Sequence, residues 1–418
     1  MNWQPPLIPS EEPEWKKYAS TEAEILEAVQ QNSIQRGVFF LTNLAALNID
    51  AVINEVRQIA SSDMELWREQ AEGESLGISQ EAFEILDRLS IPYPFYFCLP
   101  DNLEKNPRLV LYYRNVAMVS NKVMGNVKLD TLPHELGASI LPEKAKRLAA
   151  YLNEIIDALV KNSNLLSVER HIEMVYSNLG ATLDGGWRNE VGRIAYGAVL
   201  TPLIIHLHKK GKLHSVTYKT KGKIVLTEEN GNGNGKIRQQ TKTVADMSLT
   251  ELQEWLVELD EQRVVYVQFD LKNGNRLLLN RQLYWNKIGG GRAKIGPDLL
   301  TEVPTTEVPP QQYPWAGELK GGADPAGSDE HWKTAKSAFE RIIDAAAASG
   351  RPQPALSFIA TILVDRVAQE AELWIREGKL VSVYNLTKIA NDPELLLQFL
   401  EDLERFVEAK TVEDTRAE

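Results

Sequence analysis

Two short strings of residues carry the side chains best suited to chemistry. The first reads Gly-Pro-Asp-Leu-Leu at 296–300, and the second reads Glu-Leu-Lys-Gly-Gly at 318–322. Residues two apart in a strand point to the same face, so Glu318 and Lys320 should project together. Asp298 precedes them on what we predict to be a neighbouring strand. The two carboxylates and the ammonium group can therefore meet at one site.

This combination of groups suits the hydrolysis of a phosphodiester. The attacked phosphate is anionic, so a divalent metal ion must neutralise charge and lower the pKa of a bound water. Mg²⁺ prefers oxygen ligands, and Asp298, Glu318 and the backbone carbonyl of Leu319 would form a partial cage for it. Lys320 could hold the attacking water and stabilise the charge of the transition state. Glu302 is an alternative to Asp298 in this role.

A histidine follows the second string after a short loop. Ser328 is a natural N-cap, which predicts a helix over 328–348 with Trp332 and Phe339 on its buried face. His331 lies in the first turn of that helix and can come near the proposed metal site. It could act as a general base, hold a phosphate or bond a base edge. A capping or packing role is equally open.

The stretch 318–335, with Asp298 before it, resembles the PD-(D/E)XK nucleases. Within that superfamily it is similar to type II restriction endonucleases of the AvaI/BsoBI and XcyI/XamI kinds, and the segments 112–115 and 184–189 look like theirs too. In the AvaI/BsoBI enzymes a histidine at the place of His331 sits in the active site. The resemblance implies catalysis by Asp298, Glu318, Lys320 and His331 with Mg²⁺.

The same resemblance implies partners. It implies a homodimer that cuts double-stranded DNA at a palindromic site, because a two-fold enzyme presents two identical active sites to the two strands. Such an enzyme belongs to a restriction-modification system, in which a cognate DNA methyltransferase protects the host's own DNA.

The charge distribution bears on a DNA partner. The chain has 418 residues and a net charge of −12, which taken alone argues against nucleic acid. Residues 207–294, however, hold 16 basic against 9 acidic residues, a local balance of +7, so the remainder carries −19. DNA responds to the local field, within roughly 8–10 Å. The basic residues that we expect to contact DNA are Lys209, Lys210, Lys212, Lys219, Lys221, Lys223, Arg281, Arg292, Lys294 and Lys333.

The two halves of the chain differ in hydrophobic period. Residues 1–210 read as a mainly helical region that clamps DNA, forms the dimer, or does both, and 211–418 as the catalytic region. A helix over 188–208 should be kinked or interrupted by Pro202. Alternating segments predict strands that include 213–227, 264–270, 276–283, 293–303, 313–320, 355–364 and 380–386. Their order with the intervening helices indicates an α/β (α+β) fold, a mixed sheet flanked by helices.

Several classes of protein are disfavoured. We find no run of about 18 apolar residues, no secretory signal and a single cysteine, Cys98, which together fit a cytoplasmic protein with no membrane association. No phosphate-binding Gly-x-x-x-x-Gly-Lys-Ser/Thr loop is present. Two alternatives remain: a nuclease of the same core that recognises DNA structure during repair or recombination, and a non-catalytic DNA-binding scaffold. In the scaffold the Glu-x-Lys strand would be a surface strand with alternating charges.

Overall fold

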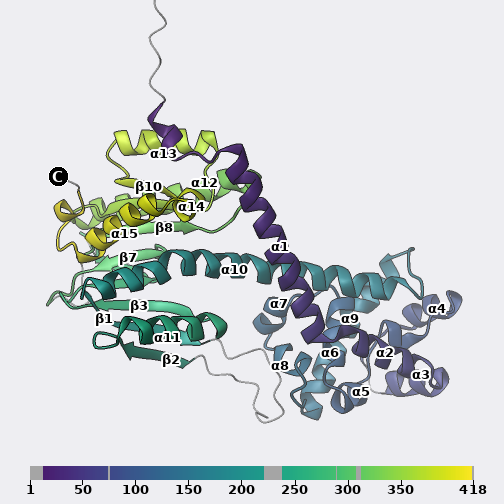
Figure 1. Cartoon of the computed structure of the whole chain (residues 1–418). Helices are drawn as coiled ribbons and strands as arrows, with labels where there is room; N and C mark the ends of the chain where they lie inside the picture. Colours follow the sequence, from purple (N-terminus) through teal and green to yellow (C-terminus); the bar gives the residue numbers. More distant parts are fainter. Residues whose placement is uncertain (1–12, 74–75, 221–237, 289, 307–311, 417–418) are drawn as a thin grey trace, which may run out of the picture. The chain divides into compact units, whose positions relative to one another are not determined.

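The computed structural model describes residues 13–73, 76–220, 238–288, 290–306 and 312–416 (Figure 1). These residues divide into two compact units. The helical unit comprises Arg36–Trp187, and the sheet unit comprises the described parts of Met1–Gln35, Arg188–Gly222 and Ile237–Glu418. Lys221, Lys223 and the Asn-Gly repeat at 230–235 lie outside the described residues.

The helical unit is built around amphipathic helices that pack on one apolar core. In addition to parts of α1 (Glu22–Leu47) and α10 (Arg170–Lys209), it contains α2 (Ile49–Ala60), α3 (Met64–Gly73), α4 (Gln80–Arg88), α5 (Pro100–Lys105), α6 (Leu109–Val116), α7 (Asn121–Asn126), α8 (Leu132–Glu135) and α9 (Pro142–Asn162). Leu148, Leu152 and Ile156 recur at helical spacing along α9 and are fully buried. This spacing in the sequence predicts an amphipathic helix over 142–162, and the structure confirms it.

The segment 112–115, which looked like part of the nuclease resemblance, serves the core of the helical unit. All four of its residues are buried. Arg114 forms a buried ion pair with Glu135, with 2.6 Å between Nε and Oε1. A buried pair of this kind is costly to break from one side, so these residues hold the unit together.

The sheet unit contains an eight-stranded mixed sheet, as predicted. Its strands are β1 (Leu213–Thr220), β2 (Arg238–Thr243), β3 (Val265–Leu271), β4 (Arg276–Leu279), β7 (Leu299–Glu302), β8 (Trp315–Lys320), β9 (Ala355–Ala360) and β10 (Ser382–Asn385). They lie in the order β10-β9-β8-β7-β4-β3-β1-β2. β8, β9 and β10 are parallel, and the other pairs are antiparallel. We call the edge at which β8, β9 and β10 end the carboxyl edge, and the opposite edge the amino edge.

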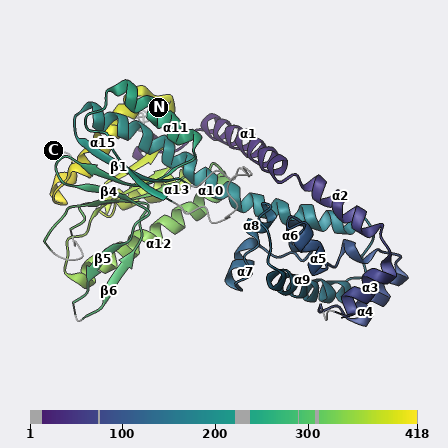
Figure 2. The same cartoon turned by 90° about the horizontal axis from the view of Figure 1, so that it is seen from below.

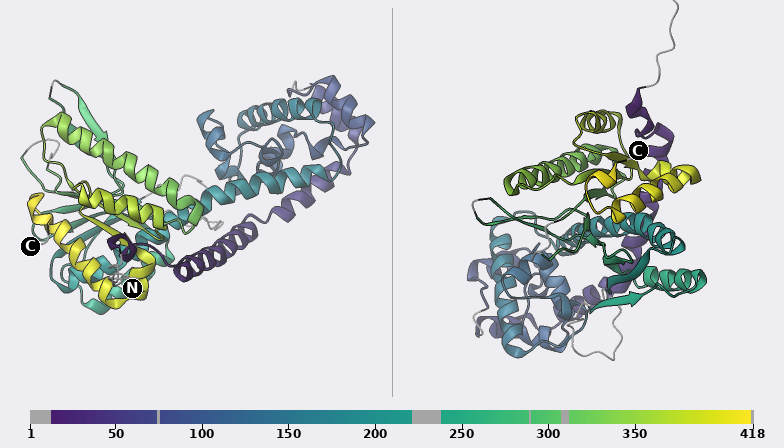
Figure 3. Two further views of the ribbon diagram at one scale, coloured as in Figure 1. Left: turned by 90° about the horizontal axis from the view of Figure 1, so that it is seen from above. Right: turned by 90° about the vertical axis from the view of Figure 1, so that its left-hand side faces the viewer.

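Helices cover both faces of this sheet, because successive strand residues alternate between two apolar cores. Leu277 and Trp315 pack with α10, α11 (Leu249–Glu261) and α15 (Pro393–Glu408). Leu278 and Ala316 pack on the other face with α12 (Pro325–Ser349) and α13 (Asp365–Arg376), which lie side by side (Figure 3). A short helix, α14 (Leu386–Asn391), joins β10 to α15.

A two-stranded ribbon of β5 (Leu283–Asn286) and β6 (Arg292–Ile295) forms a separate small sheet. We had predicted one strand over 293–303. The structure instead ends β6 at Ile295 and begins β7 at Leu299. Pro297 between them has no N–H to donate to a ladder, and the break releases Asp298 from regular pairing.

Pro202 was expected to kink or interrupt a helix over 188–208. The structure shows no interruption, because α10 runs through Pro202 as one helix. Because proline has no N–H, the carbonyl of Ala198 receives no helical hydrogen bond from position 202. Ala198 is exposed, so water can donate a hydrogen bond in its place. The two compact units meet within α10, between Trp187 and Arg188, and residues 188–209 pack on the sheet.

Two stretches, 14–60 and 170–209, are long and apolar enough to cross a membrane by length and composition alone. Core helices of soluble proteins pass the same test. In the second stretch Val199 and Leu203 are buried against the sheet, so this part of α10 is apolar because it is a core helix.

Candidate active site

Asp298, Glu318 and Lys320 meet at the carboxyl edge of the sheet. β7 and β8 pair with Leu299 opposite Gly317, which places Asp298 beside Glu318. Nζ of Lys320 donates to Oε2 of Glu318 at 2.7 Å and to Oδ2 of Asp298 at 3.1 Å. One ammonium group therefore bridges two carboxylates from neighbouring strands, on the face of the sheet that α12 covers.

The alternative acid, Glu302, lies at the other end of β7 from this cluster. It forms an ion pair with Arg276, with 3.2 Å between Oε1 and Nη1, at the amino edge. Of the two acids considered for the role, only Asp298 lies beside Glu318 and Lys320.

The backbone of β8 also faces the carboxylates. The N–H of Leu319 donates to Oδ2 of Asp298 at 2.8 Å, whereas the carbonyl of Lys320 accepts from the N–H of Thr361 at 3.0 Å on the β9 side. The N–H and C=O of one strand residue point to the same side, and neighbouring residues alternate. The carbonyl of Leu319 therefore lies on the same side of β8 as Asp298.

Burial and like charge dominate the electrostatics of the site. The side chain of Glu318 is only 5% exposed, and its burial together with the carboxylate of Asp298 raises its pKa, despite the opposing charge of Lys320. Burial alone would lower the pKa of Lys320, but the two carboxylates outweigh it and raise that pKa. The site holds more negative charge than one ammonium group neutralises.

That excess of negative charge fits a hard divalent cation. Within the residues that the structure describes, no group of three or more His, Cys, Asp or Glu side chains could hold a metal ion. The protein offers Asp298, Glu318 and a carbonyl, which matches Mg²⁺, an ion that keeps several of its waters.

Two glycines after Lys320 let other elements approach the strand end closely. A Cβ on Gly321 would lie 2.7 Å from Cβ of Ala195 and 2.8 Å from the carbonyl oxygen of Val191, both on α10. A Cβ on Gly322 would lie 2.2 Å from Nε2 of His331. Because these two residues have no side chains, α10 can pack closely on one face of the strand end and His331 on the other.

His331 packs closely against Gly322, which follows Lys320 by two residues. Burial lowers its pKa, and the charge of Lys320 lowers it further, so its imidazole is neutral at neutral pH. The helix that carries it begins earlier than predicted. Asp324 is the N-cap of α12, accepting from the N–H of Ala326 at 3.0 Å, and Ser328, the predicted cap, is buried in the helix. Pro325 at the first helical position favours this earlier start.

Sequence reasoning missed a tyrosine beneath the site. The hydroxyl of Tyr196, on α10, donates to the backbone carbonyl of Asp298 at 3.2 Å. The same carbonyl accepts from the N–H of Asn280 at 2.9 Å. Burial and the charge of Asp298 raise the pKa of Tyr196, so it stays a donor. No motif contains Tyr196, although the Gly321-Gly322 pair could have signalled that a helix packs close by.

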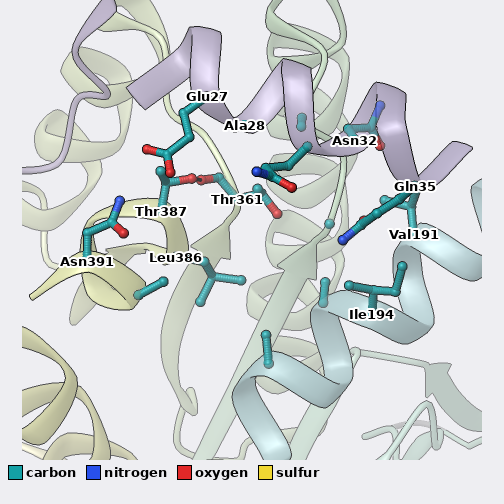
Figure 4. Close-up of a pocket in the computed structure, with 16 residues that line it drawn as sticks. Glu27, Ala28, Asn32, Gln35, Val191, Ile194, Thr361, Leu386, Thr387 and Asn391 are labelled. Carbon is teal, nitrogen blue, oxygen red and sulfur yellow. Dashed lines mark hydrogen bonds between the residues drawn. The ribbon is translucent and has the colours of Figure 1, made fainter. Parts of the chain in front are cut away.

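A pocket of about 260 Å³ also borders the strand end, among α1, α10 and α14. Figure 4 shows Glu27, Asn32 and Gln35 of α1 facing Ile194 of α10 and Thr387 of α14. Gly321 lines this pocket, but Asp298, Glu318, Lys320 and His331 do not. The pocket lies on the α10 side of β8, so it is separate from the carboxylates.

The basic residues named from the sequence do not form one surface. Lys209, Lys210 and Lys212 lie near the start of β1, at the amino edge, and Lys212 is paired with Glu404 and Glu408. Lys219, half-buried at the other end of β1, lies several strands from β8. Exposed basic residues on the α12 side of the sheet are Arg281, Arg292, Lys294 and Lys333, the last 4.0 Å from a carboxylate oxygen of Glu330.

Comparison with known proteins identifies the family of this chain. A family model described as restriction endonuclease BsobI matches residues 135–395. The type II restriction enzyme BsoBI of Geobacillus stearothermophilus is 43% identical over 79 residues, 19% of this chain and 24% of that enzyme. The type II restriction enzyme AvaI of a Nostoc species is 42% identical over 79 residues, 19% of this chain and 25% of AvaI. The match thus spans about a quarter of each curated relative. From the extent of the family match, the chain belongs to the BsoBI restriction endonuclease family.

Proposed function

We propose that this protein is a type II site-specific endonuclease that hydrolyses phosphodiester bonds of double-stranded DNA. One observation carries the proposal. In a chain of the BsoBI restriction endonuclease family, the carboxylates of Asp298 and Glu318 share the ammonium group of Lys320 at the carboxyl edge of the sheet. This is the set of groups that metal-assisted phosphodiester hydrolysis requires.

The proposed cofactor is Mg²⁺, held by Asp298, Glu318 and the carbonyl of Leu319. The ion would supply positive charge to the scissile phosphate and acidify a bound water. Glu318 is buried beside the carboxylate of Asp298, so a cation bound close by would stabilise its ionised form.

Lys320 and His331 have separate proposed roles. The ammonium group of Lys320 points at both carboxylates, so it can orient the attacking water and stabilise charge on the phosphate. Neutral His331, seated against Gly322, can accept a proton or donate a hydrogen bond to a phosphate oxygen.

The remaining proposals concern assembly. We propose a homodimer that acts on a palindromic site, because a two-fold enzyme presents one catalytic centre to each strand. The region 1–210 would clamp DNA, form the dimer, or do both, and 211–418 would carry catalysis. A cytoplasmic restriction-modification system would supply the methyltransferase companion.

Digestion of a long DNA tests this function. Purified protein with Mg²⁺ should cut phage-length DNA into discrete bands, and added chelator should abolish cutting. A smear that never resolves into bands would instead favour a structure-specific repair nuclease. Intact DNA under all conditions would favour a non-catalytic scaffold.

A further inference from the structure

The ribbon of β5 and β6 has one face in the core and one in solvent. Leu283, Trp285, Ala293 and Ile295 are buried, and they pack with α12 in the core on that side of the sheet. Figure 2 shows the ribbon running alongside α12. The N–H of Ile288, at the turn, donates to the carbonyl of Ala348 near the end of α12 at 3.0 Å. The ribbon is therefore held firmly, with a defined outer face.

The outer face is basic and contains no acid. Tyr284 pairs with Lys294, and Asn286 pairs with Arg292, so these four side chains share the solvent side of the ribbon. Arg281 and Lys287 flank β5 at either end, and all four basic residues are exposed. The stretch 281–297 contains four basic and no acidic residues, and none of the four makes an ion pair within the described part of the chain. Among the residues that the structure describes, this face therefore has no acidic partner.

The ribbon is also joined directly to the proposed catalytic centre. Asn280, which precedes it, donates its N–H to the carbonyl of Asp298, which follows it, at 2.9 Å. Asp298, Glu318 and Lys320 lie on the same face of the sheet as the ribbon. Basic side chains therefore begin at the carboxyl edge and continue away from it for roughly 20 Å, the span of six extended residues.

We infer that the outer face of β5–β6 binds the sugar-phosphate backbone of the duplex that flanks the scissile bond. This inference rests on the proposed function and adds a location for DNA on one side of the active site. Arg292 and Lys294 would neutralise phosphates of the backbone. The ribbon contributes affinity without sequence preference, because phosphate contacts carry no sequence information directly.

The salt dependence of DNA binding tests this surface. The probe is a labelled mixed-sequence duplex of about 40 base pairs, bound in Ca²⁺ to full-length wild type and to the double variant Arg292→Gln/Lys294→Gln. The slope of log affinity against log salt is negative, and each lost phosphate contact should reduce its magnitude by about 0.9, so we expect the magnitude to fall by about 2. The double variant Lys272→Gln/Lys379→Gln, which removes equal charge at the amino edge, should keep the wild-type slope.

The outcomes separate this inference from the proposed function. If wild type cuts DNA into discrete bands but the ribbon variant keeps the wild-type salt slope, the ribbon does not bind DNA and the function stands. If both double variants reduce the magnitude of the slope equally, the loss reflects the overall charge of the protein, and the inference that the ribbon binds the DNA backbone is overturned. Should wild type neither bind nor cut DNA, the function and this inference are both overturned.

Discussion

Gly322 shows how a residue without a side chain can set the position of one that acts. The imidazole of His331 occupies the space that a Cβ on Gly322 would need. Neither glycine after Lys320 has a positive φ, so close approach, and not backbone conformation, is the reason for glycine here. His331 is therefore placed by a neighbour that no catalytic motif would single out.

Replacing Gly322 with Ala should impair cleavage through His331. With the built Cβ 2.2 Å from Nε2, the imidazole must move, and we expect a loss of single-turnover rate of more than about tenfold, comparable to His331→Ala. Gly327→Ala is the matched control, since its Cβ would meet only ordinary contacts near 3.5 Å. A loss well below tenfold in both Gly322→Ala and His331→Ala would assign His331 to packing.

At the scale of elements, local signals predicted much of the sheet unit. The residues Ser-Leu-Thr-Glu at 248–251 predict a capping box, which begins α11. The residues Lys-Asn-Gly-Asn at 272–275 predict the turn that joins β3 to β4. Glu318 and Lys320 share a strand face because the period of two is geometric. Local signals do not decide how far a helix extends, and α10 continues through Pro202 as one helix.

The helical unit contains a buried histidine that should make its stability depend on pH. His171 stacks on Phe95 with 4.3 Å between ring centroids, and its Nδ1 lies 2.5 Å from the hydroxyl of Tyr112. Burial, helped by the charge of Arg57, lowers the pKa of His171 to about 4. The folded protein therefore excludes the proton that the unfolded chain binds near pH 6.5.

Acid should accordingly destabilise this unit. The contribution of His171 to the unfolding free energy should be constant above about pH 7 and fall by at most about 3 kcal/mol between pH 6.5 and pH 4, since the unfolded state binds the extra proton. Urea unfolding of the full chain at several pH values measures this. His171→Phe should flatten the fall, whereas His214→Gln, at an exposed position, should not. Equal pH dependence in wild type and His171→Phe would refute the assignment.

At the scale of the molecule, the sequence showed where basic residues lie along the chain but not where they lie in space. The stretch 207–294 has a balance of +7, yet its first lysines lie at the amino edge and its last arginine and lysine lie on the ribbon. Linear charge cannot show which strands the chain will place side by side. The two compact units are likewise not consecutive segments of the chain, because α1 and α10 each contribute residues to both units.

The central claim is that Asp298, Glu318 and Lys320 form one metal-dependent hydrolytic centre. Its most direct test is the cleavage rate of Lys320→Ala on long DNA with Mg²⁺, measured beside DNA binding by the same variant. We expect cleavage to fall by about a thousandfold or more, with binding retained, while Lys379→Ala cuts normally. Cleavage by Lys320→Ala at the wild-type rate would contradict the claim.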